Sequence, residues 1–374
     1  MRIAVPKECA AGERRVALVP ETVARMVKQG DEVLIERGAG TGSYFPDASF
    51  ERAGAELIDT SGLQRADVVV RVQPPVREEL ANYRKGQLLI SFLHVHRNAD
   101  VIAGLRDAGV TSFAMERIPR ISRAQAMDAL SSQATVAGYR AALMAAELSP
   151  SFFPMLTTAA GTIRPARALI LGAGVAGLQA IATARRLGAI VEAYDVRRAA
   201  REQVESLGAK FLAVEVDAEA AGGYARELTA EEKEREQALL RKSIAQSDVV
   251  ITTAQIPGRP APRLVSAAMV HDMKPGAVIV DLAAESGGNC ELTQPGERID
   301  INGVTVYGPL NVPSQLSAHA SVMYAKNVYN FLALMRGEGG ALHLDWADEI
   351  LSGSVVTHEG AYPSEAVRQQ LGTA

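Results

Sequence analysis

Short apolar segments alternate with helical ones along almost the whole chain, and this alternation limits the possible folds more than any other feature. Strand-like segments are expected at residues 3–5, 32–36, 68–72, 88–92 and 111–115, and again at 168–171, 190–194, 249–252, 278–282 and 304–307. Strands separated by helices form βαβ units, which build parallel sheets. The sequence therefore predicts an α/β protein with two doubly wound, Rossmann-like parallel-sheet domains.

Two long helical segments frame the second series of strands. An Ala- and Leu-rich segment at 127–148 ends before Pro150 and Pro154, because proline cannot continue a helix. A second segment, 317–335, has apolar residues at a period of about 3.6. We expect the chain to leave the first domain, build the second and return. Residues 1–134 plus 318–374 then form the first domain, and 135–317 form the second.

The composition is that of a protein with a sizeable core. Of 374 residues, 48% are hydrophobic and 22% charged, and the net charge of −4 argues against a nucleic-acid binder. Two cysteines, Cys9 and Cys290, cannot form a disulfide framework and indicate a reducing compartment. No apolar run approaches the roughly 18 residues of a membrane span, and no cluster has metal-ligand spacing. We expect neither a membrane span nor a metal.

A glycine-rich run, GAGVAG, follows the apolar segment that ends at Leu171 and opens an amphipathic helix. Gly172 permits a tight turn, Gly174 lets a pyrophosphate approach the backbone, and Gly177 allows the helix to pack closely on the strand. The unpaired N–H groups at the start of that helix favour an anion. The run therefore predicts a dinucleotide site.

The next strand ends in Asp195, which completes the dinucleotide fingerprint. Its carboxylate can accept hydrogen bonds from ribose hydroxyls and would repel a 2′-phosphate, so NAD(H) is favoured over NADP(H). Arg197 and Arg198 follow directly and weaken that preference. Polar turns at 252–255, 281–285 and 308–313 end other strands of the same sheet and should surround the same crevice.

Several specific motifs make the chain similar, over essentially its whole length, to one family. It resembles the soluble NAD(H)-binding component (domain I) of proton-translocating NAD(P) transhydrogenases, in the form made as a separate alpha-1 subunit. The motifs that carry the resemblance are PKE at 6–8, PRISRAQAMD at 119–128 with SSQ at 131–133, GAGVAG, AYDVR at 193–197, AGGYA at 221–225 and TTAQIPGRPAP at 252–262.

The resemblance implies a set of site residues. A loop of the first domain would reach the nicotinamide with Arg120, Gln125 and Asp128, with Ser131 nearby and Asp128 as a partner of Arg120. A mobile loop around Tyr224 would close on the partner component. The implied cofactor-binding residues are Gly172, Gly174, Val175, Ala176, Gly177, Asp195, Val196, Arg197, Gly223, Tyr224, Gln237, Thr253, Ala254 and Gln255.

The resemblance also implies partners. NADP(H) would be bound by domain III and protons moved by membrane domain II, both on other chains, because this chain ends before any membrane helix. A homodimer, cytoplasmic and peripheral at the inner membrane through its complex, would carry the NAD(H) site. Hydride would pass directly from NADH to NADP⁺, a step that needs positioning but no general acid or base.

The pattern also resembles alanine dehydrogenase, which uses an Arg, a Lys and a His to bind and reduce pyruvate. Arg15 and His94 stand at the first and third of these positions, but Gln73 stands at the second. A neutral amide cannot act as a cationic acid, which makes reductive amination doubtful. A third alternative is a subunit that binds NAD(H) without catalysis, since a fold does not fix a function.

Overall fold

The computed structural model describes residues 1–213, 230–255 and 260–373. Contacts divide the chain into two compact units, Met1–Gln133 with Pro313–Ala374, and Ala134–Val312. The sequence predicts domain limits at 134/135 and 317/318, and these limits stay a prediction.

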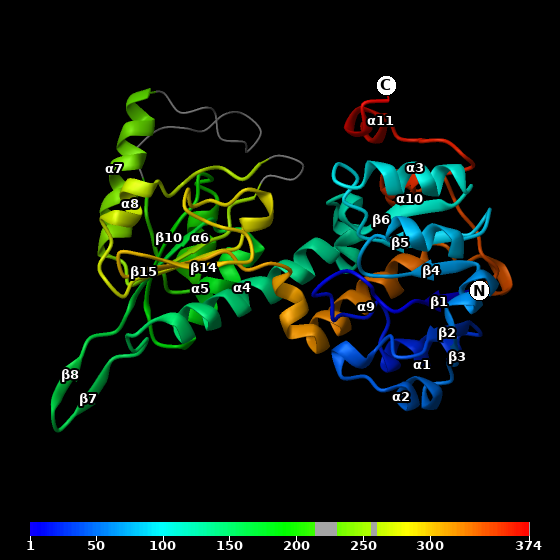
Figure 1. The fold of residues 1–374 in the computed structure, drawn as a ribbon, viewed down its shortest axis with the longest axis horizontal. Helices are drawn as coiled ribbons and strands as arrows, with labels where there is room; N and C mark the ends of the chain where they lie inside the picture. The colour runs from blue at the N-terminus through cyan, green and yellow to red at the C-terminus, as the bar shows by residue number, and fades with distance from the viewer. Residues whose placement is uncertain (214–229, 256–259, 374) are drawn as a thin grey trace. The chain divides into compact units, whose positions relative to one another are not determined.

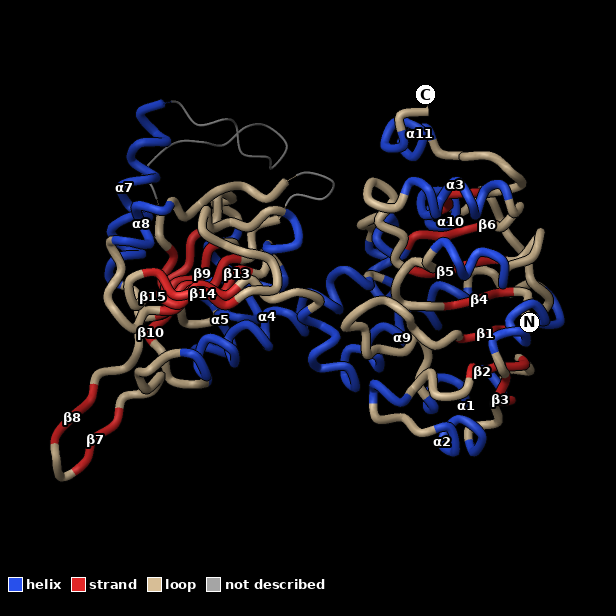
Figure 2. Tube along the Cα trace, viewed as in Figure 1, coloured by secondary structure: helices blue, strands red, loops and turns tan. Residues whose placement is uncertain are grey.

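The first unit is built on a seven-stranded sheet in the order β16-β6-β5-β4-β1-β2-β3 (Figure 2). All neighbouring strands are parallel except β16, which pairs antiparallel with β6. The strands are β1 (Arg2–Val5), β2 (Glu32–Glu36), β3 (Glu56–Ile58), β4 (Val68–Val70), β5 (Leu88–Ser91), β6 (Thr111–Ala114) and β16 (Val355–Thr357).

Helices cover both faces of this sheet, because its strands are buried on both sides and alternate residues face opposite cores. Ile3 and Val5 face a core shared with α1, α9 and α10, whereas Ala4 faces a core shared with α3 and α11. The helices of this unit are α1 (Pro20–Lys28), α2 (Asp47–Arg52), α3 (Ala99–Asp107), α9 (Ser317–Ala333), α10 (Glu349–Ser354) and α11 (Glu365–Leu371).

The second unit has its own seven-stranded sheet, in the order β11-β10-β9-β12-β13-β15-β14. Only β14 pairs antiparallel, with β15. The strands are β9 (Arg167–Leu171), β10 (Ile190–Tyr194), β11 (Lys210–Phe211), β12 (Val249–Thr252), β13 (Val278–Asp281), β14 (Arg298–Ile301) and β15 (Val304–Tyr307). The strand order reverses between β9 and β12, which is where open parallel sheets bind ligands.

Helices again cover both faces of the second sheet. Apolar residues of α4, α5 and α6 form one core, and those of α7 and α8 form the other. The helices are α4 (Ala129–Leu148), which begins in the first unit, α5 (Val175–Arg186), α6 (Ala200–Ser206), α7 (Ala230–Gln246) and α8 (Ala267–His271). A hairpin of β7 (Leu156–Thr158) and β8 (Gly161–Ile163) extends from this unit (Figure 1).

The predicted fold class is confirmed: each unit is a mainly parallel sheet with helices on both faces. The antiparallel edge strand β14 and the hairpin of β7 and β8 were not predicted. These strands are short, and β7, β8 and β14 are largely exposed, so they lack the continuous apolar pattern of a buried parallel strand.

Candidate functional site

The turn between β9 and α5 is built so tightly that two of its glycines cannot carry a side chain. Gly172 has φ +98°, and a Cβ there would lie 2.7 Å from Thr253 Oγ1. A Cβ at Gly177 would lie 1.8 Å from the carbonyl oxygen of Gly172. These contacts agree with the predicted roles of the first and third glycines: a tight turn and close packing of helix on strand.

Gly174 differs from the other two, because a Cβ there would meet nothing within 4 Å. It is exposed and precedes α5, and among the described residues no side chain caps that helix. The first N–H groups of an uncapped helix carry partial positive charge and can bind an anion. The open space at Gly174 therefore fits a phosphate group that approaches the backbone.

Asp195 lies directly after β10, and its carboxylate is only 7% exposed. One oxygen accepts a hydrogen bond from Ala173 N of the glycine-rich turn at 2.7 Å, and the other accepts from Arg197 N at 2.8 Å. The Arg197 guanidinium also binds this carboxylate, with Nε 3.0 Å from Oδ1. Burial alone would raise the pKa of Asp195, but these hydrogen bonds and the Arg197 charge hold it below its ordinary value. The ionised carboxylate thus both supports the glycine-rich turn and is partly neutralised by Arg197.

The turn after β12 packs against the glycine-rich turn. Thr253 Oγ1 donates to the carbonyl oxygen of Gly172 at 3.0 Å, and Thr253 N donates to Leu171 O at 2.8 Å. Gln255 is exposed, and its Nε2 donates to Leu282 O at 2.9 Å. The structure therefore brings the predicted residues of the β9, β10 and β12 turns together within the second unit.

Two buried polar residues behind these turns were not predicted as site residues. Asp281 and Asn289 both have no exposed surface, and each binds backbone atoms of the neighbouring turns. Asp281 begins the polar turn at 281–285 that was expected beside the crevice. No local motif marks Asn289, because its contacts join segments far apart in the sequence.

The remaining predicted residues of the second unit vary in exposure. Val175 is 42% exposed and Val196 is 56% exposed, while Ala176 is half-buried. Gln237 is exposed on α7. Gly223 and Tyr224 lie outside the described residues.

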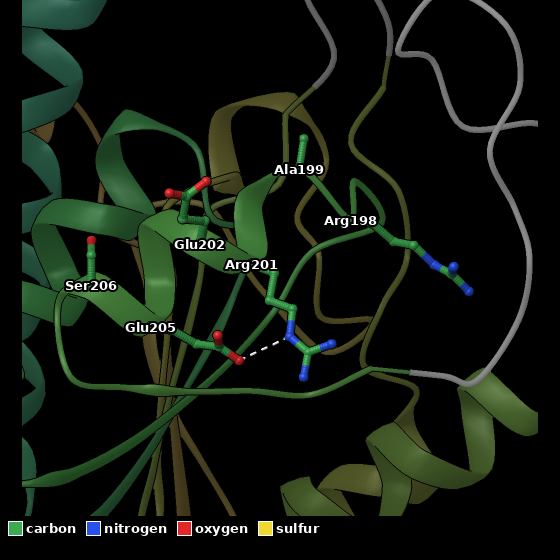
Figure 3. Close-up of a pocket in the computed structure, with 6 residues that line it drawn as sticks. All are labelled: Arg198, Ala199, Arg201, Glu202, Glu205 and Ser206. Carbon is green, nitrogen blue, oxygen red and sulfur yellow. Dashed lines mark hydrogen bonds and ion pairs between the residues drawn. The ribbon is translucent and has the colours of Figure 1, made fainter.

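A surface depression follows Arg197 directly (Figure 3). It is lined by residues of α6 and the turn before it: Arg198, Ala199, Arg201, Glu202, Glu205 and Ser206. Arg201 Nε binds Glu205 Oε1 at 2.9 Å, and Arg198 points away from this pair in Figure 3. The alternation of both charge signs is typical of a solvated helix surface, not of a phosphate site.

In the first unit, the predicted nicotinamide loop is a short 3₁₀ helix, η5 (Ser122–Met127), that precedes α4. Ala124 and Met127 are buried in the core, whereas Gln125 and Arg120 are exposed. The buried Ala124 and Met127 anchor the loop one residue before and two residues after Gln125. The amide of Gln125 is therefore exposed on a loop that is held by the core.

Polar contacts hold the same loop against α9 and α10. Asn327 Nδ2 and Asn330 Nδ2 both donate to Ala126 O, at 3.0 and 3.1 Å. Arg123 makes two hydrogen bonds to the carboxylate of Asp348, at 2.7 and 3.0 Å. The loop is thus anchored on both sides of Gln125.

Asp128 caps the N-terminus of α4. Its Oδ1 accepts from Ser131 N at 2.8 Å and its Oδ2 accepts from Ser131 Oγ at 2.6 Å. Within the described residues Arg120 makes no ion pair, so the expected Asp128–Arg120 pairing is not seen. A short acidic side chain at this position satisfies the free N–H groups of the helix instead.

Arg15 and Gln73, two of the positions shared with alanine dehydrogenase, meet at one internal carboxylate. Arg15 is 4% exposed, and its Nη2 binds Glu13 Oε2 at 2.6 Å while its Nη1 donates to Gln133 Oε1 at 2.8 Å. Gln73 Nε2 donates to the same oxygen of Glu13 at 2.8 Å. Burial would raise the pKa of Glu13, but the Arg15 guanidinium lowers it to about 2. The Arg15 charge is therefore neutralised inside the chain.

His94, the third of these positions, lies shortly after β5. It has a positive φ of 44°, its N–H donates to Glu116 Oε1 at 2.6 Å, and its ring stacks on Phe92. These contacts are sufficient to explain a histidine here as a structural residue.

In the part of the chain that the structure describes, no group of three or more His, Cys, Asp or Glu side chains could hold a metal ion. Across the same ranges, no helix combines the length and the apolar character needed to cross a bilayer.

The fold and the glycine-rich turn define the class: an α/β protein with two doubly wound domains, one of which carries a turn of the dinucleotide-binding type. Models of the two domains called "Alanine dehydrogenase/PNT", N-terminal and C-terminal, match residues 4–137 and 141–365. The chain belongs to the alanine dehydrogenase/PNT family.

Individual relatives come from both branches named in that family. The chain is 47% identical to the first part of the NAD(P) transhydrogenase alpha subunit of Rhodospirillum rubrum, over 99% of this chain and 100% of the relative. It is similar to the crystal structure of transhydrogenase from Sinorhizobium meliloti, with a TM-score of 0.90 and 46% identity, over 97% of this chain and 100% of that one. Alanine dehydrogenase of Mycobacterium tuberculosis is 31% identical, over 100% of this chain and 97% of the relative. The predicted resemblance to transhydrogenase is confirmed, and alanine dehydrogenase is the more distant relation.

Proposed function

We propose that this chain is the NAD(H)-binding component of a proton-translocating transhydrogenase. It holds NADH while hydride passes directly to NADP⁺ on a partner subunit, and separate membrane subunits couple the transfer to proton movement. The observation that carries this proposal is the full-length match, at 47% identity, to the first part of a NAD(P) transhydrogenase alpha subunit.

The second unit supplies a site that fits NAD(H). The open space at Gly174 and the uncapped start of α5 would hold the pyrophosphate, and Asp195 would accept hydrogen bonds from the adenosine ribose. Thr253, Ala254 and Gln255 would border the nicotinamide half. The carboxylate of Asp195 favours NAD(H) over NADP(H), and its pairing with Arg197 moderates that preference.

The first unit supplies Gln125, an exposed amide on an anchored loop. Gln125 would orient the nicotinamide carboxamide by hydrogen bonds, and Arg120 would support the dinucleotide. NADH itself supplies the hydride, so the chain's residues need only hold the ring in the correct position. Good alignment of two reactants can lower a barrier by up to about 7–11 kcal/mol. A site of amide, carboxylate, Arg and hydroxyl groups, without an obligatory Lys or His, suits this reaction.

The contacts of Arg15 argue against the alternative, alanine dehydrogenase. A pyruvate carboxylate would have to compete with Glu13, which binds the Arg15 guanidinium through both carboxylate oxygens. Gln73 also donates to Glu13 and cannot supply a cationic proton. A purely NAD(H)-binding subunit without catalysis is distinguished from the proposed function only by a transfer assay.

The same proposal implies other chains. The NADP(H)-binding component and the membrane component would be separate subunits, and this chain would act as a homodimer at the cytoplasmic side of the inner membrane. The name of the Rhodospirillum rubrum relative, which describes one portion of an alpha subunit, agrees with a divided complex.

A reconstitution assay tests the proposal. The purified chain is mixed with a recombinant NADP(H)-binding component, and transfer from NADH to an NADP⁺ analogue is followed by absorbance. We expect transfer in the mixture and none from either protein alone. NADH oxidation that requires pyruvate and ammonia instead would reverse the assignment in favour of alanine dehydrogenase.

A further inference from the structure

Asn289 follows β13 and is completely buried, and its side chain binds backbone atoms of another segment. Its Oδ1 accepts from Ala254 N at 3.0 Å, and its Nδ2 donates to Ala254 O at 2.8 Å and to Pro262 O at 2.8 Å. Both amide protons and the amide oxygen are therefore used. The side chain holds Ala254 by its N–H and its C=O together, as a neighbouring strand would.

Ala254 belongs to the turn on which the glycine-rich turn rests. The Ala254 nitrogen lies 3.1 Å from the position that a Cβ of Gly172 would take, and Thr253 Oγ1 donates to Gly172 O. Because Thr253 is bonded to Ala254 in the chain and donates to Gly172 O, a displacement of Ala254 would pass through Thr253 to Gly172. Asn289 thus acts on the glycine-rich turn through two residues of the β12 turn.

The neighbouring buried Asp281 provides a contrast. Its carboxylate accepts hydrogen bonds from Thr252 Oγ1 (2.8 Å), Ala283 N (2.9 Å), Cys290 N (3.0 Å) and Thr293 Oγ1 (2.6 Å). These bonds tie the ends of β12 and β13 together, and none of them reaches Thr253 or Ala254. Loss of one of them should lower stability without releasing the β12 turn.

We propose that Asn289 is a positioning residue for coenzyme binding. It fixes Ala254, and through Thr253 it fixes Gly172, so that the pyrophosphate-binding turn is already formed before the coenzyme binds. This inference rests on the proposed function, since it assigns the open side of that turn to NAD(H).

The first test needs no coenzyme. Amide hydrogen exchange at Ala254 is compared in the wild-type chain, Asn289→Ala and Thr293→Val. Exchange at Ala254 should be about 10-fold faster in Asn289→Ala than in Thr293→Val at matched thermal stability. Equal exchange in the two variants would overturn the claim that Asn289 holds the turn.

The second test measures NADH affinity by titration of NADH fluorescence. Asn289→Ala should weaken binding about 10-fold or more, while Thr293→Val stays within about twofold of wild type. Asn289→Asp keeps the acceptor for Ala254 N and regains one donor when protonated, so its affinity should improve as the pH is lowered. An equal loss of NADH affinity in Thr293→Val would indicate that Asn289 has a merely structural role. An affinity of Asn289→Asp that does not change with pH would indicate the same.

The two failures can be told apart. A wild-type chain that binds no NADH overturns the proposed function, and Ala254 exchange still decides whether Asn289 holds the turn. A wild-type chain that binds NADH, together with an Asn289→Ala variant of unchanged affinity, overturns only the role of Asn289.

Discussion

At the scale of single residues, Gln125 of the predicted nicotinamide loop is exposed, although residues near it in the loop are buried or hydrogen-bonded. Ala124 and Met127 are buried and Ala126 is held by two asparagines, whereas the Gln125 amide is exposed. Such an exposed side chain contributes little to folding, which agrees with its proposed role in orienting a ligand.

Gln125→Asn shortens this side chain by one methylene and keeps the amide. We expect hydride transfer to fall about 10-fold or more while NADH affinity changes much less, because alignment and not binding is lost. The measurement is cyclic transhydrogenation with the partner component, beside an NADH titration. Gln369→Asn, on the exposed surface of α11, is the matched control. Equal losses in affinity and rate would contradict the positioning role.

Glu8 belongs to the same scale, because one buried carboxyl makes stability depend on pH. Burial raises the pKa of Glu8 to about 7, although Arg71 nearby lowers it. The folded state therefore binds this proton more tightly than the unfolded state, and stability is lost as the pH rises from the ordinary carboxyl value through about 7.

Glu8→Gln removes this titration. Between about pH 5 and about pH 8, the free energy of unfolding of the wild type should fall by up to about 3 kcal/mol more than that of Glu8→Gln. Urea unfolding at both pH values measures the difference. The same pH dependence in both proteins would show that Glu8 is not the responsible group.

At the scale of elements, two glycines of the glycine-rich turn have different expected roles, one in folding and one in binding. A Cβ at Gly177 would overlap the carbonyl oxygen of Gly172, whereas a Cβ at Gly174 meets no atom of the chain. The same Gly→Ala change at the two positions therefore has different consequences.

Gly177→Ala should destabilise the chain by about 1–3 kcal/mol, as overpacking does. Gly174→Ala should leave stability near that of wild type and weaken NADH binding about 10-fold or more, because the added methyl group takes the space of the pyrophosphate. Thermal unfolding and NADH titration of both variants check this. A Gly174→Ala variant that binds NADH as the wild type does would place the pyrophosphate elsewhere.

Features whose residues are consecutive could be predicted from the sequence, whereas contacts between distant segments could not. Local patterns predict β2 at Glu32–Glu36 and the glycine-rich turn, because their signals lie in consecutive residues. Asn289 is different: its partners at Ala254 and Pro262 are distant in sequence, and a buried asparagine has no local signature. The place of Asp128 beside the nicotinamide stays a prediction, and its carboxylate also caps α4, a contact that the following Ser131 could have suggested.

At the scale of the whole molecule, the two units contribute different kinds of residue to the proposed reaction. The second unit carries the glycine-rich turn and Asp195, which would bind the dinucleotide, and the first carries Gln125, which would orient its reactive ring. The sequence predicts both sheets, but the internal pairing of Arg15 with Glu13 is seen only in the folded chain. That pairing separates this chain chemically from an enzyme that binds a keto acid at Arg15.

In the proposed function, NADH on this chain gives its hydride directly to a nicotinamide held by another subunit. The most direct measurement uses NADH that carries deuterium at the transferred position, mixed with the chain, the NADP(H)-binding component and NADP⁺. If hydride passes directly, the deuterium appears in NADPH and none is lost to water. Deuterium found in water, or in alanine when pyruvate and ammonia are present, would contradict the proposed function.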